Sequence, residues 1–208
     1  RRVYMGDGTT QSNEDTPGTD RGRPDAIRAA VRRLFNVPIN ERHLMNPRAL
    51  GIYKTMPRTI RLRNQNDIDT LIHEVGHHFS ETAKPVRNLM SLHQAELLAL
   101  TPEAYAKRPK ALRLEEGFAE FMRLYLTQRP AARARAPGFS IAFHGFTEAH
   151  GHDRILSEIH GMIDNWYRLS PAERILAKVG KPKPSLPERI RDAADVDRFI
   201  FEVLDNWH

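Results

Sequence analysis

Residues 71–79 read Leu-Ile-His-Glu-Val-Gly-His-His-Phe, and this stretch decides how the rest of the chain is interpreted. His73 and His77 are four residues apart, so on a helix their imidazoles project from one face about one turn apart. Both can therefore reach one metal ion at about 2.0–2.1 Å. Glu74 is offset around the helix and could contact a metal-bound water without ligating the metal. The stretch predicts a metal-binding helix.

The composition limits the metal chemistry that this helix could support. The 208 residues suffice for one domain with additions or for two small ones. The chain has no cysteine, which excludes a disulfide scaffold, an iron–sulfur cluster, a thiol nucleophile and any zinc site built on thiolates. A metal must therefore be held by carboxylates and by some of the ten histidines.

The charge and hydropathy patterns say less about partners. A net charge of +6 is compatible with nucleic acid, but the basic residues are scattered among acids, so a solvated surface is the preferred interpretation. No stretch approaches the roughly 18 uncharged apolar residues of a membrane span, so we expect no membrane partner.

A catalytic zinc site needs a third protein ligand and an open position for water. No histidine lies six residues after His77, so we expect a carboxylate from another helix. Glu116 is preferred because Gly117 beside it lets another helix approach closely. Glu120, one turn further on, can accept the spare N–H of a ligating imidazole. The alternatives left open for the third ligand are Glu96, Glu115 and Glu120.

The remaining pattern predicts a predominantly helical α+β fold with a small sheet just before the metal helix. The expected strands are Leu50–Lys54 and Thr59–Arg63, and the proline before the second places it at a sheet edge. Asn66 or Asp67 is expected to cap the metal helix. The expected helices begin at Pro24 and then cover about Asp67–Glu81, Val86–Leu100, Lys110–Gln128 and Asp153–Leu169. The segment between the last two is expected to be loop, Gly-rich and mobile from Phe143 to Asp153.

Four parts are expected along the chain. Residues 1–23 have the polar composition of a disordered leader, and residues 24–180 form the metal-binding domain. Residues 181–187 are a proline-rich linker, and residues 188–208 are a terminal helix that packs on the domain or on a missing neighbour. Ser170 and Glu173 match a capping box. No apolar signal core is present at the start, and we expect the chain to be a domain of a longer protein.

The two motifs His-Glu-Val-Gly-His (73–77) and Glu-Glu-Gly-Phe-Ala-Glu-Phe (115–121) resemble those of the zincin metallopeptidases whose third ligand is glutamate, the gluzincins. In the aminopeptidases of this group the ligand belongs to a similar Glu-Gly-Phe-Ala sequence, which matches Glu116. In thermolysin-like members an acid four residues later orients a histidine, which matches Glu120. Residues 24–140 are also similar to metallopeptidase domains of large polyvalent proteins of bacteriophages and mobile elements. The longer separation of the motifs here implies an inserted helix, Val86–Leu100.

The resemblance implies a zincin-like zinc metalloendopeptidase with one Zn²⁺ per chain, held by His73, His77 and Glu116. Glu74 would act as general base on a zinc-activated water and then protonate the leaving amine. The edge strand Thr59–Arg63 would bind a polypeptide by β-addition. Zincins usually add a Tyr or His donor for the oxyanion, and the candidates here are Tyr125, His144, His150 and His152.

The expected partner is a polypeptide substrate, either the parent polyprotein or a host protein. The expected location is the cytoplasm, with delivery as part of a larger phage or mobile-element protein. One alternative is a non-peptidase zinc hydrolase, because the motif fixes the water-activating centre and not the substrate. Another is a catalytically silent zincin-fold module that binds protein or nucleic acid. The presence of both histidines, the Glu base and a third carboxylate argues against a degenerate site.

Overall fold

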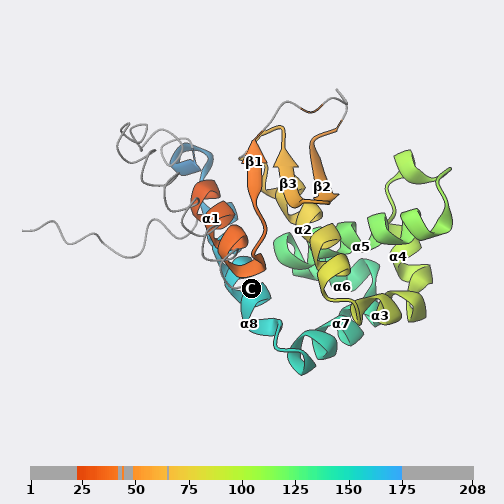
Figure 1. The fold of residues 1–208 in the computed structure, drawn as a ribbon. Helices are drawn as coiled ribbons and strands as arrows, with labels where there is room; N and C mark the ends of the chain where they lie inside the picture. Colours follow the sequence, from red (N-terminus) through yellow and green to blue (C-terminus); the bar gives the residue numbers. More distant parts are fainter. Residues whose placement is uncertain (1–22, 42–43, 45–48, 65, 175–208) are drawn as a thin grey trace, which may run out of the picture. The chain divides into compact units, whose positions relative to one another are not determined.

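The computed structural model describes residues 23–41, 44, 49–64 and 66–174 (Figure 1). Its contacts divide the chain into two units, Arg1–Arg168 and Leu169–His208. The first unit contains, among its described residues, a three-stranded sheet and a set of helices, which confirms the predominantly helical α+β class. In the second unit, Ser170 and Glu173 make the reciprocal hydrogen bonds of the predicted capping box. The predicted leader (apart from Arg23), linker and terminal helix lie outside the described residues.

The sheet precedes the helix that carries the two histidines, as predicted, but it has a third strand, and the strand predicted at its edge lies in its centre. Strands β1 (Ile39–Glu41), β2 (Gly51–Thr55) and β3 (Arg58–Leu62) lie in the order β1-β3-β2, with β1 parallel and β2 antiparallel to β3. The predicted edge strand, residues 59–63, is therefore wrong as an edge and cannot add a substrate strand, because β3 is paired on both sides. The reason is that Pro57 lies in the turn before β3, so its missing N–H removes no bond from the ladder.

Helix α2 (Ile68–Thr82) carries the two histidines and begins where the sequence predicts. The carboxylate of Asp67 accepts a hydrogen bond of 3.0 Å from the backbone N–H of Thr70, which caps the first turn. The helix packs against the sheet on one side and against α5 (Lys110–Thr127) on the other, as Figure 1 shows. The fully buried residues between these elements include Leu71, Ile72, Val75, Phe118, Phe121 and Met122.

Several helices differ from the predicted ranges. The single helix expected over residues 86–100 is two helices, α3 (Val86–Leu92) and α4 (Gln94–Leu100), because His93 between them has a non-helical backbone. A short 3₁₀ helix, η1 (Glu103–Tyr105), joins α4 to α5. Helices α1 (Pro24–Phe35) and α8 (Asp153–Arg168) agree with the prediction and pack against each other.

The loop expected between residues 129 and 152 is wrong. It contains α6 (Arg129–Arg135) and α7 (Pro137–Ala149). The prolines that suggested a loop stand in the first turn of each helix, where the missing N–H has no intrahelical partner to lose. Phe139 and Phe143 on α7 are fully buried, so α7 is held by the core and is not a mobile cover.

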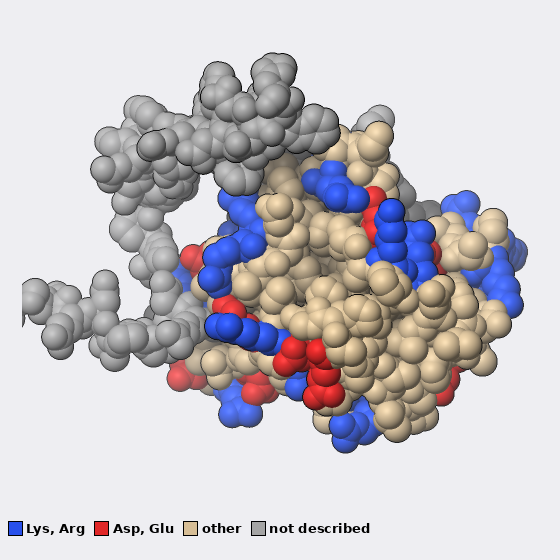
Figure 2. Space-filling model, turned by 60° about the horizontal axis from the view of Figure 1, so that its bottom comes forward, with Lys and Arg blue, Asp and Glu red and all other residues tan. Residues whose placement is uncertain are grey.

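The described surface carries mixed charge. Lys and Arg are interspersed with Asp and Glu on the face shown in Figure 2, and much of that face carries neither. Among the described residues, no helix combines the length and the apolar character needed to cross a bilayer.

Candidate metal centre

The structure brings His73 and His77 of α2 together with Glu116 of α5. One ligand atom from each lies within 4.8 Å of the others. His73 Nε2 is 3.3 Å and His77 Nε2 is 3.6 Å from Glu116 Oε2. The helical spacing places the imidazoles on one face, and the packing of α2 on α5 supplies the carboxylate. This group of two histidines and one glutamate could hold a metal ion.

The donor set and its spacing fit a small divalent cation. Ligands about 2.0–2.1 Å from a tetrahedral zinc ion are about 3.3 Å from one another, close to the two separations observed. Glu116 is 6% exposed, and its Oε2 is buried without a hydrogen bond of ordinary geometry. A buried carboxylate oxygen is costly to leave without a partner, and a cation bound here would supply one.

The pKa shifts of His73 and Glu116 in the metal-free group also favour binding of a cation. Burial lowers the pKa of His73, but the carboxylates of Glu116 and Glu120 outweigh it and raise this pKa to about 9. Burial also disfavours ionised Glu116, yet the two imidazoles bring its pKa down to about 2. The carboxylates thus favour a proton on His73, and the imidazoles favour the ionised form of Glu116. A divalent cation bound between these side chains would take the place of such a proton.

Glu74 lies beside this group without belonging to it. Its side chain is buried against β2, where Glu74 Oε1 would be 2.8 Å from a Cβ placed on Gly51. Burial raises the pKa of Glu74, while His77, His73 and the backbone amide of Tyr53 oppose the rise. Glu74 is therefore a buried carboxylate with a raised pKa beside a group that could hold a metal ion, and such carboxylates are found at functional sites.

Glu120 lies one turn beyond Glu116 and faces the other nitrogen of His73. Its Oε2 is 3.8 Å from His73 Nδ1 and accepts a hydrogen bond of 2.9 Å from Arg123 Nε. Burial would raise the pKa of Glu120, but Arg123 and His73 lower it to about 2. The carboxylate of Glu120 thus lies near one of the two candidate ligating imidazoles, as the sequence analysis expected, and that imidazole is His73.

The alternative third ligands have other partners. Glu96 accepts hydrogen bonds from the backbone N–H groups of Gly138 (3.1 Å) and Phe139 (2.8 Å) and so caps α7. Glu115 accepts a hydrogen bond of 2.7 Å from Ser80 Oγ. Both carboxylates serve the packing of helices.

The role expected for Gly117 needs a correction. Gly117 does admit another helix, but that helix is α4, whose Leu97 carbonyl lies against it. The helix that shares the metal centre with α5 is α2, and it approaches through Gly76 and Ala119. The sequence analysis was right to take a glycine as the sign of a close helix crossing, but the glycine at the crossing of α2 and α5 is Gly76 and not Gly117.

The four predicted oxyanion donors lie elsewhere, and none of these side chains lines the two pockets beside the triad. Tyr125 stacks on Phe121 under the guanidinium of Arg129. The exposed His144 pairs with Glu148, and His150 stacks on Phe146.

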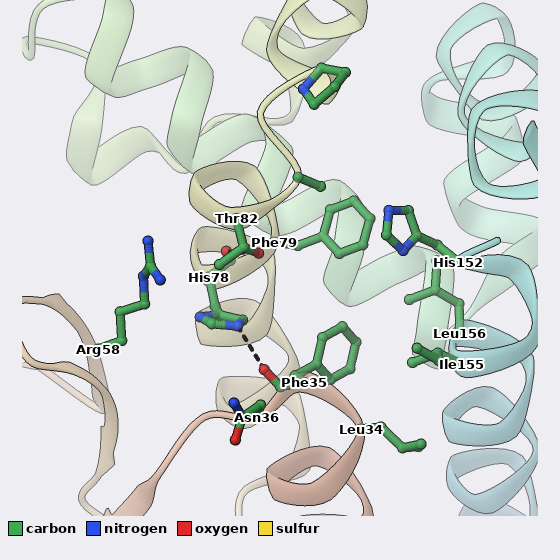
Figure 3. Close-up of a pocket in the computed structure, with 12 residues that line it drawn as sticks. Leu34, Phe35, Asn36, Arg58, His78, Phe79, Thr82, His152, Ile155 and Leu156 are labelled. Atoms are coloured by element: carbon green, nitrogen blue, oxygen red, sulfur yellow. Dashed lines mark hydrogen bonds between the residues drawn. The ribbon is translucent and has the colours of Figure 1, made fainter. Parts of the chain in front are cut away.

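His152 lines a separate cavity of about 480 Å³ on another face of α2. Figure 3 shows this cavity, with His152 opposite Phe79 and with His78 bonded to the carbonyl of Phe35. The second nitrogen of His78 is 3.2 Å from the hydroxyl of Tyr53. Since both ring nitrogens of His78 have partners, this imidazole is structural.

Tyr105 is the residue that the sequence analysis missed. It belongs to η1 and lines both pockets beside the triad, of about 440 and 500 Å³, which also share His73, Glu74 and Gly51. Burial and the charges of Glu116 and Glu74 raise the pKa of Tyr105, so its hydroxyl stays protonated at neutral pH. The only sequence signal for it was its place between the two motifs.

Scans against protein-family models, curated proteins and solved structures found no match to this chain.

Proposed function

We propose that this chain is a zinc-dependent peptide hydrolase, a gluzincin-like metalloendopeptidase in which His73, His77 and Glu116 hold one zinc ion. The observation that carries the proposal is the buried Oε2 of Glu116, which faces two imidazole nitrogens at 3.3 and 3.6 Å and has no hydrogen bond. Two neutral imidazoles and one carboxylate leave a fourth position open on zinc, as in catalytic sites.

The chain's own residues supply the remaining chemistry. Zinc, when bound, lowers the pKa of a water molecule and polarises the scissile carbonyl. Glu74 accepts the proton of the attacking water and passes it to the leaving amine. Tyr105, protonated and facing Glu116, donates a hydrogen bond to the oxygen that gains charge during attack.

A polypeptide is the substrate favoured by the surroundings. Among the strands that the structure describes, β2 is at an edge of the sheet, and its residues 51–53 and 55 line the pocket next to Glu74. An edge strand offers unpaired backbone groups to an extended chain. The two pockets that Glu74 and Tyr105 both line provide room for side chains of a bound peptide. The substrate that we propose is the parent polyprotein or a host protein, in the cytoplasm.

The first experiment measures zinc per chain by elemental analysis, together with cleavage of an unbiased peptide library followed by mass spectrometry. We expect close to one zinc per chain and cleavage that Glu74→Gln abolishes while zinc stays bound. Glu158→Gln, an exposed carboxylate on α8, is the matched control and should cut normally.

Two results would replace the proposal. Stoichiometric zinc without cleavage of any peptide favours a zinc hydrolase for another substrate. Absence of zinc after reconstitution at neutral pH favours a binding module, which a salt-dependent nucleic-acid titration then examines.

A further inference from the structure

A network of charged and polar side chains lies behind His73, on the side away from Glu116. Arg123 grips Glu120 with two hydrogen bonds, Nε to Oε2 at 2.9 Å and NH2 to Oε1 at 2.7 Å. Its third nitrogen, NH1, donates to Asp69 Oδ1 at 2.9 Å. A single guanidinium thus joins two carboxylates, one from α5 and one from α2.

Asp69 stands one turn before His73 on α2, so its side chain emerges on the same face of the helix. Its other oxygen, Oδ2, accepts a hydrogen bond of 2.7 Å from the hydroxyl of Tyr167 on α8. The side chain of Arg123 is 22% exposed and that of Glu120 is 16% exposed, so water screens the pair only partly. Tyr167 and Asp69 fix the position of Arg123 from outside, and Arg123 fixes Glu120.

We propose that Arg123 is a positioning residue of the metal centre. Its two hydrogen bonds to Glu120 hold that carboxylate 3.8 Å from His73 Nδ1, and Asp69, itself bonded to Tyr167, fixes the guanidinium. The inference rests on the proposed metal site and adds to it a support that extends from His73 to the last helix of the unit.

The physical basis is the geometry of the guanidinium. A carboxylate on a flexible glutamate can rotate away from an imidazole, and each such rotation weakens its hold on the ring orientation. Two parallel hydrogen bonds fix both the plane and the position of the carboxylate. A lysine in place of Arg123 would keep the charge. Its ammonium group, however, cannot make two parallel hydrogen bonds to Glu120 and a third to Asp69 at the same time. Partners of this kind typically change metal affinity about 10- to 100-fold.

The test measures zinc affinity by competition with a chromophoric chelator, and the visible spectrum of the cobalt-substituted protein. The variants are Arg123→Met, Glu120→Gln and the double variant. We expect each single change to weaken zinc binding about 10- to 100-fold and to shift the cobalt spectrum. The double variant should bind no more weakly than the weaker single one, because Arg123 acts through Glu120.

Arg123→Lys separates an effect on zinc binding from an effect on folding, because it keeps the positive charge. It should unfold at the wild-type temperature but bind zinc at least severalfold more weakly. Arg168→Met, which removes an exposed ion pair with Asp164 on α8, is the matched control and should change neither readout.

Wild-type affinity and spectrum in both Arg123 variants would overturn the inference while leaving the proposed function intact. Losses that add in the double variant would also overturn it, since they would show that Arg123 acts independently of Glu120. A wild-type protein that binds no zinc would overturn the proposed function, and this inference with it.

Discussion

Gly76 on α2 lies directly against Ala119 on α5: a Cβ on Gly76 would be 2.7 Å from Ala119 Cα and 3.1 Å from Met122 Cβ. This tight contact lies between the two helices that carry the three candidate ligands. Because the neighbouring atom is backbone, a side chain here cannot be relieved by a rotamer change. The distance between the histidines and Glu116 therefore depends on the absence of one methyl group.

We expect Gly76→Ala to push α2 and α5 apart, with a loss of about 1–3 kcal/mol in the free energy of unfolding and a weaker hold on zinc. Denaturant unfolding and zinc titration measure the two effects. Gly145→Ala is the control, because Gly145 lies on α7 with nothing within 4 Å of an added Cβ. That substitution should stabilise the helix by about 0.5–1 kcal/mol. Equal behaviour of the two variants would contradict the close crossing.

Zinc should stabilise the folded chain, because a ligand that binds only the native state shifts the unfolding equilibrium. Free zinc at 100 times its dissociation constant is expected to add about 2.7 kcal/mol. His77→Ala should abolish the gain, whereas His144→Ala, on the exposed face of α7, should retain it. Thermal unfolding with and without zinc measures this, and a zinc-induced gain that persists in His77→Ala would exclude His77 as a ligand.

Zinc binding should strengthen as pH rises towards 9. The pKa of His73 is raised to about 9 in the metal-free protein, so zinc must displace a proton below that pH. The apparent affinity should fall about tenfold for each pH unit below 9. Calorimetry at pH 6.5, 7.5 and 8.5, in buffers of different ionisation enthalpy, reports both the affinity and the released proton. A flat affinity over this interval would show that His73 is already neutral.

The same shift has the opposite consequence for the metal-free fold. A pKa raised from about 6.5 in the unfolded chain contributes stability below that pH, and this contribution disappears as pH rises through about 9. The lowered pKa values of Glu116 and Glu120, each about 2, contribute stability above about 4.5, and this contribution is lost as pH falls through about 2.

Tyr105→Phe should leave zinc binding unchanged and lower kcat about 100- to 1,000-fold, because it removes a donor to the developing oxyanion. Tyr125→Phe is the matched control, since Tyr125 stacks on Phe121 and lines neither pocket beside the triad. Steady-state kinetics on the peptide found in the library measure both. A larger effect at Tyr125 than at Tyr105 would instead favour Tyr125, one of the four oxyanion donors that the sequence analysis named.

Glu96→Ala should destabilise the fold by about 1–2 kcal/mol, because two backbone N–H groups at the start of α7 lose their acceptor. Zinc content should remain that of the wild type. Glu158→Ala removes an exposed ion pair with Arg33 of α1, so it should destabilise the fold less than Glu96→Ala does and should leave the zinc content unchanged. Loss of zinc in the Glu96 variant, with the fold retained, would show that Glu96 is a zinc ligand.

Much of the candidate metal site could be predicted from the sequence, because the patterns that indicate it lie within single helices. Asp67 caps α2 through a hydrogen bond to a residue three positions later, and the i,i+4 spacing places His73 and His77 on one face whatever surrounds them. Glu116 could be ranked first because its neighbours on α5 suggested a crossing helix. These inferences need only the geometry of single helices.

The errors came where a local signal has two structural meanings. A proline ends a helix or begins one, so the segment after Gln128 was taken for loop although Pro130 and Pro137 open α6 and α7. Pro57 likewise belongs to a turn before a central strand, and the partner that makes β3 central, β1, is a three-residue strand. Such a strand is too short for its hydrophobic pattern to be recognised.

The sequence by itself therefore determined the helix with its two imidazoles on one face, the neighbouring Glu74 and the predominantly helical class of the fold. Only the tertiary structure decided that Glu116 faces them, that Glu96 and Glu115 bind other helices, and that Tyr105 enters the site. The physical reason is distance along the chain. Helix geometry fixes residues within one or two turns of each other, whereas the meeting of residues from α2, η1 and α5 depends on how side chains pack between those elements.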